Sequence, residues 1–181
     1  MKNNKGFTVV ELIVTFVLVM SLAVGLFAVV DSYRERQQKE TNLKELNSYR
    51  NEILKIVQDD FLNKGIEDIE GISTEESSSS ECKGFNQGIV VKYKDGDKKT
   101  FCVGEQGIKY NNILYPKPLG DFVSFANDII YTESKDFQLT APDGTTKVTK
   151  KILSINVKIK HSELEDPIEL RVVGVNTTRN P

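Results

Sequence analysis

The stretch that decides the fold is residues 1–30, MKNNKGFTVVELIVTFVLVMSLAVGLFAVV. From Leu12 to Val30 no residue carries a charge, and as a helix this run spans about 28 Å, close to the hydrocarbon thickness of a bilayer. The run therefore predicts one membrane-spanning helix. Glu11 stands at its start, and an acidic side chain left alone in lipid costs about 3 kcal/mol at the centre of a membrane-spanning helix. We expect this carboxylate to have a partner.

The polar remainder of the chain is predicted to be exported, because Lys2 and Lys5 precede the apolar run and favour a cytoplasmic N-terminus. Its length is typical of one domain. Without Lys2, Lys5 and Glu11 the chain has 22 basic and 25 acidic residues, so it lacks the basic footprint of a nucleic-acid-binding domain. We interpret the lysines of residues 92–99 and 145–151 as exposed residues on strand edges and in turns. We therefore do not expect a nucleic-acid partner.

An ordinary secretory signal is the alternative for this N-terminal segment. Ser21 to Ala23 has the small-x-small pattern of a signal cleavage site. Against this alternative, the apolar pattern continues past Ala23, and Glu11 interrupts the hydrophobic region that a conventional signal needs. The pattern favours a segment that is retained as an anchor.

Residues 5–11, KGFTVVE, followed directly by the apolar run, resemble the class III leader of type IV pilins and type II secretion pseudopilins. The resemblance implies that a prepilin peptidase removes residues 1–6 by cutting between Gly6 and Phe7, and then methylates the new amine of Phe7. It also implies that Glu11 pairs with the N-terminal amine of a neighbouring subunit. The implied partners are this peptidase, other pilin or pseudopilin subunits, and an assembly platform in the cytoplasmic membrane.

The resemblance further implies a pilin-like α+β fold, with a long N-terminal helix, transmembrane in its first half, packed on an antiparallel β-sheet head. The expected parts are a transmembrane or filament-core helix at 7–30, an amphipathic continuation at 31–65, and a globular β-rich head at 66–181. Many family members have a helix-kinking proline where this chain has Ala28, so Gly25 is the candidate hinge.

The continuation of the helix carries one apolar stripe on a polar segment that contains no proline. The positions of this stripe recur at three- and four-residue steps: Leu43, Leu46, Tyr49 or Arg50, Ile53, Ile56 or Val57, and Phe61. This spacing predicts a helix that packs one face on the head and ends at Gly65.

The strongest strand signal in the head is residues 88–103, two β-prone runs around an Asp-Gly turn, which predict a hairpin. Residues 152–160 alternate between apolar and polar side chains and predict another strand. The acidic, serine-rich stretch 65–82 is interpreted as a surface loop. Cys82 and Cys102 are the two cysteines; an oxidising compartment favours a disulfide between them, and two free thiols are the alternative.

Candidate catalytic and metal-binding residues are few in this head. His161 is the single histidine and is interpreted as a surface residue at a strand end. Asp59 and Asp60 are expected to be a solvated pair near the end of the helix, and Asp95 and Asp97 to form a turn. We therefore expect no metal site, no cofactor and no enzymatic activity.

Together these features predict a structural subunit, a minor pilin or pseudopilin of a type IV pilus or a type II secretion-like filament. Its single membrane pass would place the head outside the cytoplasm, in a cell-surface or periplasm-spanning filament. The serine-rich loop and the charged head favour a minor subunit, because they do not suit uniform self-packing. The alternatives are a pilin-anchored receptor or adhesin that binds DNA or a surface ligand, and an unrelated membrane-anchored exported protein.

Overall fold

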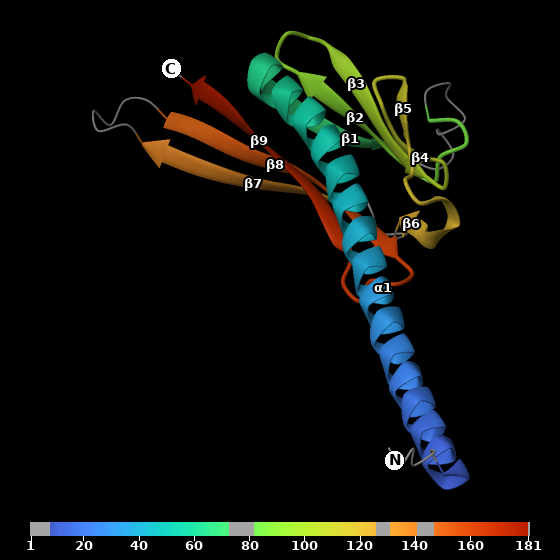
Figure 1. The fold of residues 1–181 in the computed structure, drawn as a ribbon. Coiled ribbons are helices and arrows are strands. Elements are labelled where there is room, and N and C mark those ends of the chain that lie inside the picture. The colour runs from blue at the N-terminus through green and yellow to red at the C-terminus, as the bar shows by residue number, and fades with distance from the viewer. Residues whose placement is uncertain (1–7, 73–81, 126–130, 141–146, 181) are drawn as a thin grey trace. The chain divides into compact units, whose positions relative to one another are not determined.

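The computed structural model describes the backbone of residues 8–72, 82–125, 131–140 and 147–180, and side chains within 8–72, 82–125 and 152–176 (Figure 1). The chain divides into two compact units, residues 1–42 and 43–181. The expected α+β arrangement of a long N-terminal helix followed by antiparallel β-sheets is confirmed.

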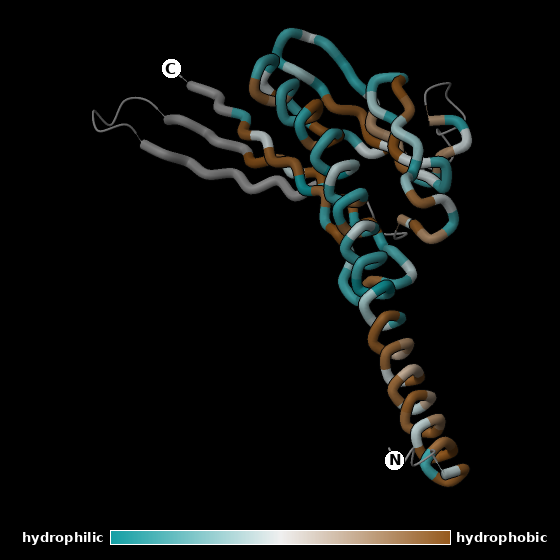
Figure 2. Tube along the Cα trace, in the orientation of Figure 1, coloured by the Kyte–Doolittle hydropathy of each residue, from teal (hydrophilic) through white to brown (hydrophobic). Residues whose placement is uncertain are grey.

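Helix α1 spans Val9–Asp60 and continues as one π-helical turn, η1, at Phe61–Gly65. Gly65 has a φ of 66°, a left-handed conformation that a residue without a Cβ adopts easily and that ends the helix there. The hydropathy of α1 changes along its length. Its first part is almost wholly apolar and its second part is largely hydrophilic (Figure 2).

The first unit consists of the apolar part of α1 and the polar turns that follow it. Its large apolar side chains are exposed along the whole run, for example Val9 at 73% and Leu26 at 66%. By length and composition this helix is able to cross a membrane. A Cβ at Gly25 would meet no atom within 4 Å, and α1 continues through this residue without a break.

The second unit contains two antiparallel sheets, whereas the sequence pattern had predicted one. In sheet A the strand order is β1-β2-β3-β4-β5, with β1 at Ile66–Ile72, β2 at Gln87–Tyr93, β3 at Lys98–Gly104, β4 at Gly107–Tyr110 and β5 at Ile113–Pro116. Sheet B is built on β8, and its strands are β6 at Val123–Phe125, β7 at Tyr131–Thr140, β8 at Lys147–His161 and β9 at Ile168–Asn180. Figure 1 shows β7, β8 and β9 side by side.

The predicted stripe on α1 is the helical part of the core. Its buried members are Leu46, Tyr49, Ile53, Val57 and Phe61. They form one apolar cluster with side chains from both sheets: Ile89, Val91, Phe101, Val103, Ile108, Leu153, Ile155, Val157, Ile159, Leu170 and Val172. Leu43 is 41% exposed, so the buried stripe begins one step later than predicted.

Sheet B reaches the end of the helix at a glycine. A Cβ on Gly174 of β9 would lie 2.7 Å from Ile66 Cγ2 and 2.8 Å from Phe61 Cδ2, closer than real Cβ atoms approach. The absence of a side chain at Gly174 therefore lets β9 pack directly on η1 and on the start of β1.

The predicted hairpin is present as β2 and β3, which pair from Gln87↔Val103 to Lys92↔Lys98. Gly96 in its turn has a φ of 85°, and the Asp95 carboxylate accepts the Asp97 N–H at 3.0 Å, as expected of a turn aspartate. The alternating stretch 152–160 is also a strand, within β8.

Two interpretations of polar segments were wrong. The stretch expected to be a loop contains β1, because its isoleucines pair with the apolar β2, as Ile69↔Val91 shows; residues 73–81 lie outside the described part of the chain. The lysines of β8 between 147 and 151 are not on a strand edge. Long-range pairing places β7 on one side of that strand and β9 on the other.

Candidate functional site

Thr8 and Glu11 bond to each other at the start of α1. The Thr8 backbone N–H and the Thr8 hydroxyl each donate to Glu11 Oε2 at 2.9 Å, and the Glu11 N–H donates to Thr8 Oγ1 at 3.3 Å. This reciprocal pattern is a capping box, which satisfies N–H groups that have no partner inside a helix. Glu11 therefore has a partner within its own chain.

The partner expected for Glu11 from the sequence was the amine of a neighbouring subunit, and the contact with Thr8 was missed. The signal was present, since Ser or Thr followed three residues later by an acidic residue, just before an apolar run, is a capping-box pattern. The expected processing residues Gly6 and Phe7 lie outside the described residues.

The hydroxyls inside the apolar run bond to the helix itself. Thr15 Oγ1 donates to the Glu11 carbonyl oxygen at 2.7 Å, and Ser21 Oγ donates to the Val17 carbonyl oxygen at 2.8 Å. Polar groups that are satisfied within one helix do not need water. Apart from Glu11, this part of α1 presents a surface suited to lipid or to another apolar helix.

A disulfide joins Cys82 to Cys102 of β3, with a Cα–Cα distance of 5.6 Å and a sequence separation of 20. Both cysteines are almost fully buried. Cys102 pairs with Gly88 of β2, and a Cβ on Gly88 would lie 2.6 Å from Cys82 Sγ. The disulfide thus holds the segment before β2 against sheet A. Cys82 Sγ occupies the space that a side chain at Gly88 would need.

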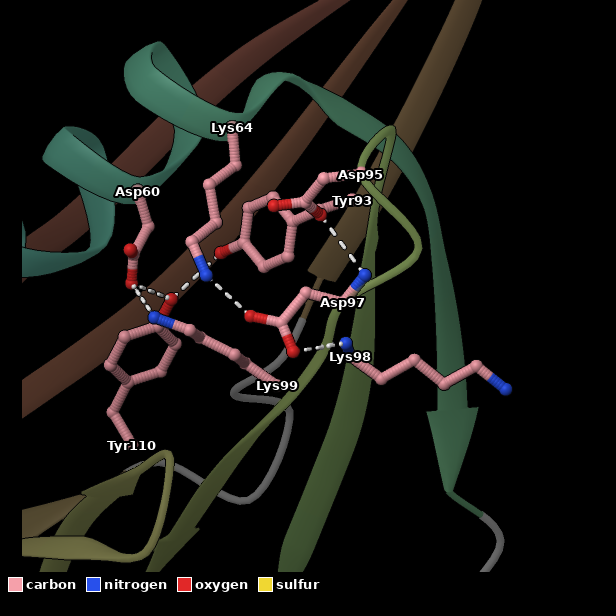
Figure 3. A network of polar contacts seen from close by, with 8 residues as sticks. All are labelled: Asp60, Lys64, Tyr93, Asp95, Asp97, Lys98, Lys99 and Tyr110. Carbon is pink, nitrogen blue, oxygen red and sulfur yellow. Dashed lines mark hydrogen bonds and ion pairs between the residues drawn. The ribbon is translucent and has the colours of Figure 1, made fainter.

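Asp60 is the centre of a polar network at the end of α1 (Figure 3). Its Oδ2 accepts hydrogen bonds from Lys99 Nζ at 2.7 Å and from the Tyr110 hydroxyl at 2.6 Å. The hydroxyls of Tyr93 and Tyr110 are 2.7 Å apart. Because the Tyr110 hydrogen points to Asp60, we assign Tyr93 as the donor to Tyr110. Burial is the main reason why the pKa of each of these two tyrosines lies above the ordinary value for tyrosine. Both hydroxyls therefore keep their protons near neutral pH.

The expectation of a solvated Asp59–Asp60 pair was therefore wrong for Asp60, whose side chain is only 19% exposed in its pair with Lys99; Asp59 is exposed. Negative charge at a helix C-terminus is unfavourable beside the macrodipole. Lys99, from a strand 39 residues along the chain, provides the compensating charge. Sequence spacing does not reveal a partner at that distance.

Lys64 of η1 forms an ion pair with Asp97 in the β2–β3 turn (Figure 3). The hydrogen bond between them is the main cause that lowers the pKa of Asp97 and raises the pKa of Lys64. The Lys64 ammonium also lies 5.8 Å from the centroid of the Tyr93 ring. This ion pair and the Asp60 network both connect the end of the helix to sheet A.

His161 was expected on the surface, and this was wrong. It is 5% exposed, because β6 pairs with the end of β8 and places Val123 opposite it. Its Nδ1 accepts the Glu163 N–H at 3.1 Å, and its ring stacks on Phe122 with centroids 6.2 Å apart. Within the described residues, no cluster of three or more His, Cys, Asp or Glu side chains is placed to hold a metal ion.

The N-terminal residues match a known family model, whereas the head has no matched relative. Residues 1–27 match the prokaryotic N-terminal methylation motif. No curated protein and no solved structure matches the chain. The matched range includes the quoted Gly-Phe step, the Thr8–Glu11 box and most of the apolar run. The chain therefore carries the class III prepilin leader of the type IV pilins and pseudopilins.

Proposed function

We propose that this protein is a filament subunit, a minor pilin or pseudopilin, that is cut between Gly6 and Phe7, methylated on Phe7 and assembled through α1. The observation that carries the proposal is the methylation motif at residues 1–27 on a helix that continues unbroken to Asp60. Loss of a leader of six residues leaves this helix attached to the head. The subunit would be held by one membrane pass, with its head outside the cytoplasm.

The geometry around Glu11 supports assembly in two steps. In the single chain, both Thr8 donors bond to Glu11 Oε2, which lowers the cost of a carboxylate entering lipid. A carboxylate has about four acceptor sites, so Oε1 remains able to accept the Phe7 amine of a neighbouring subunit. Glu11 then neutralises a positive charge that would otherwise be buried in the filament core.

The head fits a subunit that is exposed to partners or solvent. A disulfide and an apolar core around the second part of α1 stabilise it, and its charge is nearly balanced. We favour the minor subunit because the head carries charged side chains of both signs and an acidic, serine-rich segment. These features suit a subunit at specific positions better than one repeated along a uniform surface.

The experiment that tests this function follows tagged protein between the membrane fraction and sheared filaments. Glu11→Gln keeps the shape of the side chain but leaves the neighbour's amine with a neutral acceptor. An unpaired buried charge typically costs about 3 to 5 kcal/mol, so we expect the variant to be processed and retained in the membrane but depleted from filaments.

Glu40→Gln is the matched control, because Glu40 is an exposed carboxylate on the same helix beyond the apolar run. It should reach filaments in wild-type amounts. If Glu11→Gln protein is processed normally and also enters filaments in wild-type amounts, the proposed pairing is wrong. If the wild-type protein itself never enters a filament fraction, the proposed function is wrong.

A further inference from the structure

Tyr49 of α1 inserts its hydroxyl between two strands of sheet A. The hydroxyl donates to the Tyr115 carbonyl oxygen at 2.8 Å and accepts the Ile108 N–H at 3.1 Å. Ile108 of β4 and Tyr115 of β5 are opposite each other in the strand register. One helix side chain thus bridges backbone groups of β4 and β5. Burial is the main cause that raises the pKa of Tyr49, so the hydroxyl keeps its proton.

The Asp60 network holds the same strand at a second point. Tyr110 ends β4, two residues after Ile108, and donates to Asp60 at 2.6 Å, while Lys99 of β3 donates to the same oxygen. Tyr49 and Asp60 are separated by about 16 Å along the helix axis. Strand β4 is therefore tied to α1 by Tyr49 at one end and by Asp60 at the other (Figure 3 shows the Asp60 end).

The contacts between these two points are of a different kind. Ile53 and Val57 lie between Tyr49 and Asp60 and are buried in the apolar core. Apolar burial is non-directional and scales with area, so it resists separation of the surfaces more than sliding. Hydrogen bonds weaken steeply when the donor and acceptor move out of line. The polar contacts at the two ends therefore define the position of β4 along the helix.

We propose that Tyr49 and Asp60 form a two-point latch that fixes β4 on α1, and that loss of either point releases β4 and β5 locally while sheet B stays closed. Sheet B packs on the helix end through the close contact of Gly174 with Phe61, which neither latch residue provides.

Native-state amide hydrogen exchange of the full chain in detergent tests the proposal. Two variants each remove one hydroxyl and keep the ring: Tyr49→Phe removes the bridge, and Tyr110→Phe removes one arm of the Asp60 network. A hydrogen bond to a charged group contributes about 1.5 to 3 kcal/mol, so we expect exchange in β4 and β5 to accelerate about tenfold to a hundredfold in Tyr110→Phe. Tyr49→Phe should accelerate the same amides, while amides around Ile155 and Val157 of β8 keep the wild-type rate.

Asp60→Asn and Glu70→Gln form a matched pair of carboxylate-to-amide changes. Glu70 pairs with Lys92 on sheet A, but its side chain is 53% exposed, against 19% for Asp60. We expect Asp60→Asn to reproduce the local release and Glu70→Gln to leave exchange unchanged. The proposal is overturned if the latch variants accelerate both sheets by the same factor, if they leave β4 and β5 at the wild-type rate, or if Glu70→Gln has the same effect as Asp60→Asn.

Discussion

The hydroxyl of Thr8 both donates to the Glu11 carboxylate at 2.9 Å and accepts the Glu11 N–H at 3.3 Å. Two residues that sequence reasoning treats separately are therefore one structural unit at the start of α1. A carboxylate that is hydrogen-bonded in its own chain needs less help to enter lipid, and a helix with a defined first turn presents that carboxylate in a fixed position. Thr8 should matter for the behaviour of Glu11.

Replacing Thr8 with Val keeps the shape of the side chain and removes the hydroxyl. Loss of an N-cap hydroxyl typically costs about 1 kcal/mol, so the amides of Val10 and Glu11 should exchange about fivefold faster in the full chain in detergent. Thr8→Ser should retain the wild-type rate, because serine caps as well as threonine. Equal exchange rates in the Val and Ser variants would show that the hydroxyl does not define the helix start.

Much of the fold could be predicted because its signals are local. The apolar stripe from Leu46 to Phe61 follows the helical period, the Asp-Gly turn lies between two β-prone runs, and Gly65 adopts a left-handed conformation. Each of these features depends on residues within one or two turns or one hairpin. The family resemblance at the N-terminus was equally local.

The missed features depend on contacts between distant segments. Asp60 meets Lys99 and Tyr110, which are 39 and 50 residues away, so its neighbours alone made it appear solvated. His161 is buried because β6 returns to pair with the end of β8. The division of the head into two sheets likewise depends on which strands pair with each other. Neither the composition of a strand nor its alternation of apolar and polar residues determines its pairing partner.

The disulfide and the glycine beneath it give a paired prediction. Gly88→Ala would place a Cβ 2.6 Å from Cys82 Sγ, so we expect it to lower the free energy of unfolding in urea by about 1 to 3 kcal/mol through overpacking. Gly71→Ala is the control, since a Cβ there meets no atom within 4 Å. We expect this variant to lose less free energy of unfolding than Gly88→Ala. Cys82→Ser should cost about 2 to 4 kcal/mol. Equal stabilities of the two alanine variants would contradict the packing account.

Three buried tyrosines in the described part of the chain predict a loss of stability in alkali. Tyr49, Tyr93 and Tyr110 have a pKa raised by burial above the ordinary 10.0. Below about pH 10 both states hold these protons, and above it the unfolded chain releases them while the folded head retains them. The free energy of unfolding should then fall by about 1.4 kcal/mol per pH unit for each such tyrosine. Urea unfolding above pH 10, with Tyr110→Phe showing a shallower slope, checks this; an unchanged slope would contradict it.

The central claim is that the chain is a processed prepilin, and intact-mass spectrometry with N-terminal peptide mapping of the protein extracted from membranes tests it most directly. The account predicts an N-terminus at Phe7 bearing one methyl group, and it predicts that a Gly6→Leu variant retains residues 1–6. The methylation motif at residues 1–27 supports this outcome. An N-terminus at Met1 in cells that contain an active prepilin peptidase, or one near Val24 after ordinary signal cleavage, would contradict it.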